Sequence, residues 1–427
     1  MNIKYLIIGA FVVPSWTTAS TPADSALTSP LGYNAFMEQV LSSNLGYAAE
    51  KLNLSEAEAN LKAAKVFNDP SLSVGYADND DRRMQMGRSV EVELSKTITV
   101  GKRSANIDLA TSEKELNEAL LEDFFHSLRA EATAAYLEAV KQRELYAVKE
   151  DSYQNILRLA DADSIRLQLG EITIVDATHS RLEAEIAANE LLEAHTEMIN
   201  ACSSLALWTG SFDKNLINVP AGKFENEERL FSADELLRTA LENRADLAAA
   251  MKNVDVAQRA LKVVKRERNM DFDVALGYNF NTEVRNEIAP APQFNGISIG
   301  IAVPLKFSNA NKGAVHAAEY RRQQAELNYQ QAELEVQTSV MQSLRKYQSA
   351  TLQARRFETG MMDKALSILN GKIYSYQRGE TSRLEVLSAQ QTYDDLRTSY
   401  IEALFNSLVS LVELERNAGI WDVVIRD

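Results

Sequence analysis

The side chains that most often perform catalysis or bind metal are few in this chain and widely spaced. His179 and His195 share one predicted helix but lie sixteen residues apart, too far to bind one ion together. His126 and His316 are the other histidines, and no HExxH pattern is present. Cys202 is the only cysteine and sits in an Ala/Ser/Leu run, where we expect a small buried apolar side chain. The sequence therefore predicts no metal site, no cofactor and no disulfide.

Enzymatic motifs are missing as well. There is no GxSxG elbow, no P-loop and no dinucleotide fingerprint. The formal net charge of -15 argues against a nucleic-acid partner, because binding phosphates requires a basic face. Carboxylates are abundant, but on charged helices most of them form solvated faces. We therefore predict a protein that is not an enzyme.

The first residues have the pattern of a secretory signal peptide. Lys4 supplies a positive charge, Tyr5 to Val13 is an apolar run, and Pro14 ends it. Small residues place the expected cleavage after Ala19, and no cysteine nearby would carry a lipid anchor on the mature N-terminus. Nowhere does the sequence reach the ~20 apolar residues of a membrane helix. An exported chain of this kind would enter a membrane as β-strands.

An internal repeat organises the elements that position these residues. The segment 169–173 matches 378–382 around a Gly-Glu pair, and 72–76 matches 274–278. Such a duplication fixes the architecture before any other feature. The expected divisions are a signal peptide (1–19), an N-terminal segment (20–34), a first structural repeat (35–215), a linker or equatorial segment (216–230), a second structural repeat (231–420) and a C-terminal tail (421–427).

Each repeat contains one very long helical pattern. No glycine or proline occurs between Lys102 and Leu169, which predicts a helix of roughly 60 residues and ~90 Å. Its counterpart runs from Gly313 to Arg378 and is interrupted only by Gly360 and Gly371. Two shorter helices laid end to end match the length of each long one, which suits a tall cylinder wall. These shorter helices are expected at about 35–66, 172–208, 232–268 and 380–417.

Four segments alternate like β-strands. The pattern is strict in 271–281 and 297–305 and weaker in 72–76 and 90–100, where Lys96 interrupts the apolar face. Lys96 could lie at an interfacial rim or mark a bulge. The polar loops 78–88 and 282–294 would be extracellular. A half-buried hairpin on a soluble domain is the commoner origin of such a pattern, but here it occurs in both repeats.

Four strands cannot close a membrane barrel, since single-chain barrels begin at eight. An open sheet edge in lipid leaves backbone groups unpaired at several kcal/mol each. Several copies must therefore complete one barrel, and three copies of four strands give twelve. The fold class predicted is mainly α with membrane β-strands, built from a duplicated helix–strand–strand–long helix–helix unit.

This arrangement resembles the TolC family of outer-membrane efflux proteins from about Tyr33 to Gly419. The cues are the duplicated unit, the Gly-Glu turns and the segment 99–103 that enters the first long helix. The segments 68–70 and 101–103 look most like the heavy-metal branch typified by CzcC. The resemblance implies a homotrimer with a twelve-stranded β-barrel in the outer membrane and a long α-helical barrel in the periplasm.

The resemblance also implies partners and docking residues. The helical tips would bind a periplasmic adaptor protein, which links the channel to an inner-membrane pump. Glycine at the two tips also fits ordinary helix capping, whether or not an adaptor binds. The tip residues assigned in this way are Leu169, Gly170, Glu171, Arg378, Gly379 and Glu380.

A periplasmic gate follows from the same resemblance. Counted from the turn glycines, Asp176 and Tyr376 match a linked aspartate and tyrosine, and Glu385 matches the first of two ring aspartates. Thr381 stands where the family has a linking arginine, and Ser388 replaces the second ring aspartate. Asp176 and Glu385 are equally compatible with solvated first-turn acids. The alternative function is a soluble periplasmic coiled-coil adaptor, which would need no lipid-facing strands. Neither reading names the cargo.

Overall fold

The computed structural model describes residues 27–80, 85–213, 216–224, 228–304, 311–423 and 425. The expected signal peptide and part of the first extracellular loop lie outside these residues. The first repeat contains α1 (Tyr33–Ser43), α2 (Leu45–Ala64), β2 (Ser71–Asp80), β3 (Gln85–Thr99), α3 (Lys102–Gln168) and α4 (Ile174–Thr209). The second contains α5 (Ala233–Asn243), α6 (Ala245–Arg266), β5 (Asp271–Asn281), β6 (Phe294–Ala302), α7 (Lys312–Arg356), the π-turn η2 (Phe357–Met361), α8 (Met362–Gln377) and α9 (Arg383–Ala418).

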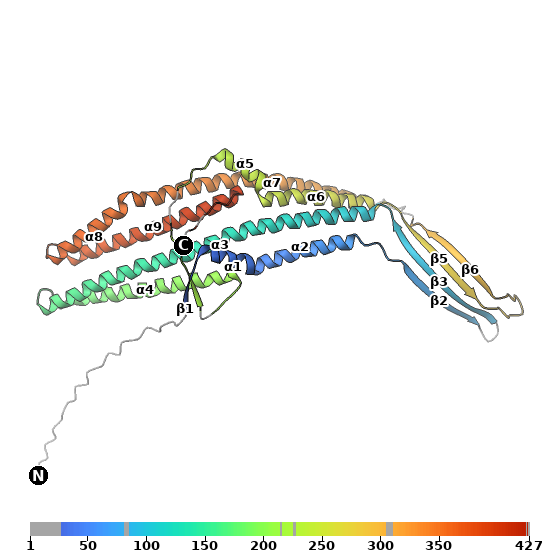
Figure 1. Cartoon of the computed structure of the whole chain (residues 1–427), viewed down its shortest axis with the longest axis horizontal. Helices are drawn as coiled ribbons and strands as arrows, with labels where there is room; N and C mark the ends of the chain where they lie inside the picture. Colours follow the sequence, from blue (N-terminus) through green and yellow to red (C-terminus); the bar gives the residue numbers. More distant parts are fainter. Residues whose placement is uncertain are drawn as a thin grey trace, which may run out of the picture.

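The molecule is elongated, with the sheet at one end and the turns that connect α3 to α4 and α8 to α9 at the other (Figure 1). Helix α3 is 67 residues long, or ~100 Å at 1.5 Å per residue. It contacts α2 along one part of its length and α4 along the other. The predicted pairing of one long helix with two stacked short ones is confirmed in the first repeat.

The helices expected over 35–66 and 232–268 are each broken into two. The breaks fall at Asn44 and Arg244, which both have extended backbone. The Asn44 side chain accepts from Tyr47 N at 2.9 Å and donates to the Trp208 carbonyl at 3.1 Å. Arg244 donates to the Asn417 carbonyl at 3.2 Å. Both side chains therefore bind the last turn of their repeat's final helix, which straight helices would not permit.

The second long helix is interrupted at one of the two predicted glycines. At Gly360 the backbone has φ 93°, inside the π-turn η2 that separates α7 from α8. Thr359 beside it also leaves helical geometry, with ψ 45°. Gly371 lies within α8 and does not interrupt it. Such π-turns kink helices, so the α8–α9 hairpin departs from the line of α7.

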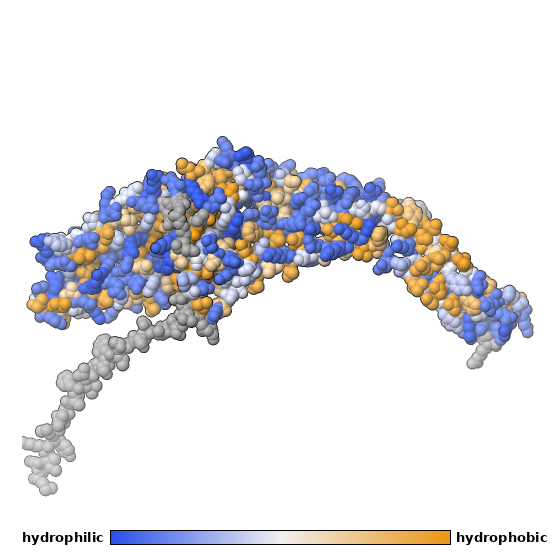
Figure 2. All heavy atoms as spheres, viewed as in Figure 1, coloured by the Kyte–Doolittle hydropathy of each residue, from blue (hydrophilic) through white to orange (hydrophobic). Residues whose placement is uncertain are grey.

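The four long strands form one antiparallel sheet in the order β2-β3-β5-β6. Cross-strand partners place like residues on one face: Leu94 lies opposite both Leu72 and Leu276, and Leu276 lies opposite Ile299. These side chains are exposed, Ile299 to 76%. Figure 2 shows the resulting hydrophobic belt over the sheet, with a hydrophilic outer end.

Lys96 keeps the register of its strand. It lies opposite Val274, and the β3–β5 pairing runs from Ser89 to Thr99 without a shift. The bulge considered for this position is therefore absent. Its ammonium lies 6.0 Å from the Phe67 ring centroid, at the end of the sheet that meets the helices. This position fits an interfacial rim, where a long amine can reach water.

The main core lies midway along the molecule. Strand β1 (Leu27–Leu31) pairs in parallel with β4 (Leu216–Pro220) beside it. The Tyr136 hydroxyl donates to the Leu31 carbonyl at 2.9 Å and accepts from Gly222 N at 3.1 Å. This ring also packs on Phe36, at 5.4 Å between centroids. These contacts hold β1, β4 and α1 against α3 at the equator, while the two repeats meet along the molecule, through β3 and β5 in the sheet and through α3 with α6 and α9 in the helical part.

Candidate functional site

The two tips end their helices in the same way. Gly170 and Gly379 have φ of 76° and 75°, the left-handed conformation that glycine adopts without strain. Glu171 N donates to the Arg166 carbonyl and Glu380 N to the Ser375 carbonyl, both at 2.9 Å. An added Cβ at either glycine would touch nothing within 4 Å. Backbone geometry alone therefore requires glycine there.

Both tips combine apolar and charged side chains. Around the α3–α4 turn, Leu169, Ile174 and Val175 expose apolar side chains to water, and Arg166 pairs with Glu171 at 3.3 Å. At the α8–α9 turn, Arg378 forms an exposed ion pair with Glu380 at 3.2 Å, and Leu384 is exposed. Both turns lie at the same end of the molecule (Figure 1). Together they present a mixed surface to any partner at that end.

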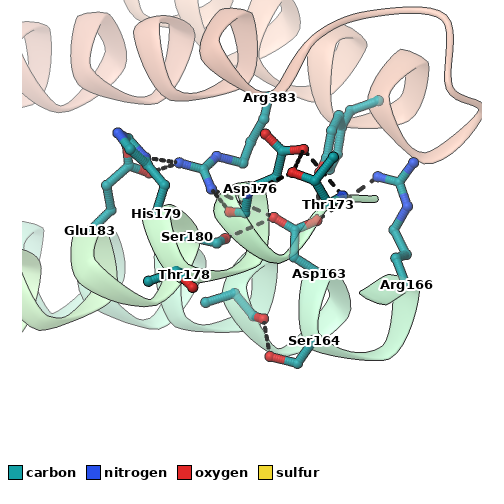
Figure 3. Close-up of polar contacts among 12 residues, drawn as sticks. Asp163, Ser164, Arg166, Thr173, Asp176, Thr178, His179, Ser180, Glu183 and Arg383 are labelled. Atoms are coloured by element: carbon teal, nitrogen blue, oxygen red, sulfur yellow. Dashed lines mark hydrogen bonds and ion pairs between the residues drawn. The ribbon is translucent and has the colours of Figure 1, made fainter. Parts of the chain in front are cut away.

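Just inside the tips, polar contacts tie the α8–α9 hairpin to the α3–α4 hairpin (Figure 3). We call these residues the gate cluster: Asp163, Asp176, His179, Ser180, Glu183, Tyr376 and Arg383. Its centre is Asp163, whose carboxylate is almost fully buried. Tyr376 Oη donates to Asp163 Oδ1 at 2.5 Å and Ser180 Oγ to Oδ2 at 2.7 Å. Burial and this bond raise the pKa of Tyr376 to about 12, so it remains a donor at physiological pH.

Asp176 does not bind Tyr376, which corrects the pairing taken from the family resemblance. Its carboxylate accepts from the Thr173 hydroxyl at 2.6 Å and the Thr173 amide at 3.3 Å, forming a capping box at the start of α4. Both hydrogen bonds lower the pKa of Asp176, and the bond from the Thr173 hydroxyl has the larger effect. The capping role left open in the sequence accounts for the Asp176 side chain.

Arg383 makes the second link between the hairpins. It is the first residue of α9, and its side chain reaches three groups on α4 (Figure 3). One nitrogen donates to the Asp176 carbonyl at 3.0 Å. Another lies 2.7 Å from Glu183 and 2.5 Å from His179 Nδ1. An arginine is thus present at the gate. It lies two residues beyond Thr381, which is the position at which the family resemblance would place an arginine.

Glu385 is bound within its own hairpin. Its carboxylate accepts a hydrogen bond from the Lys372 ammonium of α8, which holds the pKa of Glu385 below its usual value. The pair borders a groove of about 600 Å³ between α8 and α9, whose lining includes Ile368, Leu384 and Ser388. Glu385 therefore carries a negative charge that a lysine of the same chain partly offsets.

The face of the sheet opposite the hydrophobic belt is polar and acidic. Glu93 lies between Ser73 and Gly277, and Glu91 lies opposite Asn279. Asp273 accepts from Thr97 at 2.5 Å. Among the described strand residues, this face carries carboxylates but no lysine, arginine or histidine. Alternation along the strands thus separates an apolar surface from one that attracts cations.

Two residues at the centre of the gate cluster escaped sequence reasoning. Asp163 lies within α3, seven residues before Gly170, where it looked like one more solvated helical acid. Arg383 lies two residues past the position at which an arginine was sought. The signal that could have found Asp163 is that the Tyr376 hydroxyl needs a buried partner. The sequence does not show which acid is buried, because the burial of Asp163 depends on how the hairpins pack.

No group of three or more His, Cys, Asp or Glu side chains among the described residues could hold a metal ion. None of the helices in the described ranges is long and apolar enough to cross a membrane.

Several known proteins are similar to this chain in sequence or in architecture. The model of the outer membrane efflux protein family matches residues 236–419, which is the second repeat. The cobalt-zinc-cadmium resistance protein CzcC of Cupriavidus metallidurans is 24% identical, and the alignment covers 96% of this chain and 97% of that protein. This similarity spans both repeats.

Solved structures share the fold. CusC superposes with a TM-score of 0.74 at 17% identity, covering 91% of this chain and 92% of CusC. The CmeC outer membrane channel of Campylobacter jejuni gives 0.73 at 17% identity, covering 90% and 85%. VceC of Vibrio cholerae gives 0.71 at 17% identity, covering 90% and 95%. The second repeat matches the outer membrane efflux protein family, and the chain as a whole is similar in sequence to CzcC and in fold to CusC, CmeC and VceC.

Proposed function

We propose that three copies of this outer-membrane efflux channel protein form one passive exit duct, joined through a periplasmic adaptor to an inner-membrane pump. The observation that carries the proposal is the four-stranded sheet with an exposed apolar face. Strands β2 and β6 form its two edges, and among the described strands each is paired on one side only. In lipid those groups need partners, and neighbouring copies supply them.

The helical part supports the periplasmic half of the duct. Helices of this length bury little core by themselves, and many apolar side chains along them are exposed, among them Leu182 and Ile186 on α4. Such faces are covered when neighbouring copies pack side by side. The tips point away from the sheet, so a membrane around the strands leaves Leu169–Glu171 and Arg378–Glu380 to meet the adaptor.

The gate cluster supports a closed resting state. Tyr376 and Arg383 hold the α8–α9 hairpin against α3 and α4, through Asp163, Glu183 and the Asp176 carbonyl. Opening the channel at this end would separate these contacts. The duct transports without energy of its own, in keeping with a family of transport channels.

Reconstitution into planar bilayers tests the duct. The purified protein, without nucleotide or a pump, should give discrete single-channel conductance that starts from a low resting level. A soluble periplasmic adaptor, the alternative function, would give none. Protein that remains a trimer in detergent yet never conducts would contradict the proposal.

We also propose that the cargo is cationic. The relative CzcC is named for resistance to cobalt, zinc and cadmium. In this chain Glu91 and Glu93 lie on the polar face of the sheet, which faces the lumen if the hydrophobic belt faces lipid. Rings of carboxylates favour cations in a pore. The observation specific to this chain is that the described strand positions of that face carry no basic residue, although Lys102 of α3 pairs with Asp271 at its helical end.

Charge selectivity tests the cargo class. Replacing Glu91→Gln and Glu93→Gln together should lower the cation-to-anion permeability ratio, about two- to threefold, because the lumen loses its field. The measurement is the reversal potential in a salt gradient. Glu235→Gln, which removes one carboxylate from α5 at the equator, should leave the ratio unchanged. Equal selectivity in all three proteins would contradict a cationic preference set by the sheet.

A further inference from the structure

We propose that His179 makes the channel pH-sensitive, so that acidification weakens the hold of α4 on Arg383 and favours the open state. The inference rests on the proposed gate and adds a proton as its regulator. Histidine is the side-chain type that changes its charge between pH 5 and 8, and His179 is the histidine of the gate cluster.

The contact with Arg383 fits a neutral imidazole in the closed arrangement. Arg383 Nη2 lies 2.5 Å from His179 Nδ1 (Figure 3). A guanidinium is always charged and can only donate. An imidazole that accepts this hydrogen bond at Nδ1 carries its proton on Nε2. The His179 side chain is 60% exposed, whereas that of Arg383 is 14% exposed. Protons from solvent can reach the ring without opening the cluster.

Protonation removes this acceptor and adds a like charge. Nδ1 then bears a hydrogen, and the imidazolium faces the guanidinium at contact distance. The new Nδ1–H has an acceptor nearby, since Glu183 Oε1 lies 3.1 Å away. Glu183 also binds Arg383 through Oε2 at 2.7 Å. The histidine thus competes for the carboxylate that holds Arg383.

The charged groups that face His179 come from its own helix and from the helices packed against it. Glu183 and Asp176 belong to its own helix, and Arg383 belongs to α9. Behind Arg383 lies Asp163 of α3, at 3.9 Å. Tyr376 still donates to Asp163 when His179 is charged, so the proton weakens one of two links between the hairpins. The expected result is a graded shift toward opening and not a loss of closure.

The test is single-channel recording at about pH 7.5 and about pH 5.5, on either side of ordinary histidine titration. The open probability of the unaltered protein should rise about fivefold on acidification, the effect of losing one such hydrogen bond. His179→Gln should remain at the low value at both pH values, because its amide oxygen can still accept from Arg383. His316→Gln is the matched control: it removes a histidine that also lies near a glutamate, Glu319 at 3.6 Å, on α7.

The control variant should keep the full pH response. An equal response in His179→Gln and the unaltered protein, or no response in either, would overturn the pH inference and leave the channel function intact. Arg383→Gln should show raised opening at both pH values and so confirm that the arginine transmits the effect. Failure of every variant to conduct would instead count against the duct itself.

Discussion

At the residue scale, the gate depends on a carboxylate held away from water. Asp163 is 1% exposed and accepts hydrogen bonds from Tyr376 and Ser180. Its two arginine neighbours, Arg166 and Arg383, remain 3.9 Å away. A buried carboxylate that loses a donor retains its full desolvation cost. The hydroxyl of Tyr376 is therefore worth more than its single bond suggests.

Tyr376→Phe should open the channel more often. Removing the hydroxyl leaves Asp163 one donor short and should weaken the closed state by about 1–2 kcal/mol. The expected result is about a tenfold rise in open probability in planar bilayers. Tyr374→Phe is the control, because that side chain is exposed on α8 and its hydroxyl accepts from Arg378, at 2.9 Å. Equal effects of the two substitutions would show that Asp163 does not hold the gate.

A second buried acid provides a pH-dependent test at the equator. Glu415 is fully buried and accepts from Arg229 at 2.9 Å and from two backbone amides, Asp422 N at 2.6 Å and Val423 N at 3.0 Å. Burial raises the pKa of Glu415 despite these bonds. A raised folded-state pKa favours the fold below the ordinary carboxyl range, and that contribution is lost as pH rises through the raised value.

Arg229→Met should therefore destabilise the protein most at neutral pH. It leaves a buried charge uncompensated, and we expect a loss of about 2–3 kcal/mol in the free energy of unfolding at about pH 7.5. The loss should shrink at about pH 5, where the carboxyl takes up a proton. Denaturant titration at the two pH values measures it. Arg355→Met, which breaks an exposed pair with Glu228, should change stability by less than about 0.5 kcal/mol.

At the element scale, the left-handed backbone at the tips requires glycine. This requirement can be tested separately from the low helix propensity of glycine. Gly170→Ala forces a side chain into φ 76° and should cost about 1 kcal/mol. Gly371→Ala lies inside α8 with open space around it and should instead stabilise that helix by about 0.5–1 kcal/mol. Hydrogen exchange near each site should speed up for the first and slow down for the second. The same sign for both would refute the capping account of the tips.

Much of the element plan could be read from the sequence. The absence of glycine and proline located α3, and strict alternation located β5 and β6, because those signals depend only on local geometry. The breaks at Asn44 and Arg244 could not be predicted, since each depends on a carbonyl more than 160 residues away in the sequence, at Trp208 and Asn417. The partner of Tyr376 escaped for the same reason. The sequence places its side chain on a helix, but packing of the two hairpins decides that Asp163 faces it.

At the scale of the whole molecule, a single chain is incomplete as a membrane protein. The apolar face of the sheet is exposed at positions such as Ile297, Ile299 and Ile301. Among the described strands, β2 and β6 are each paired on one side only, and backbone groups left unpaired in lipid are costly. Both defects disappear if copies join edge to edge, β6 of one to β2 of the next. Assembly and membrane insertion are then one event.

The most direct test of this account is the mass of the mature protein by light scattering, in detergent extracts of the outer membrane and in the soluble fraction. The account predicts a trimer that is recovered only with detergent, because the shared strands hold the copies together and present the hydrophobic belt. A monomer that stays in solution without detergent would contradict it. The strands would then form no shared barrel, and a periplasmic coiled-coil role would replace the duct.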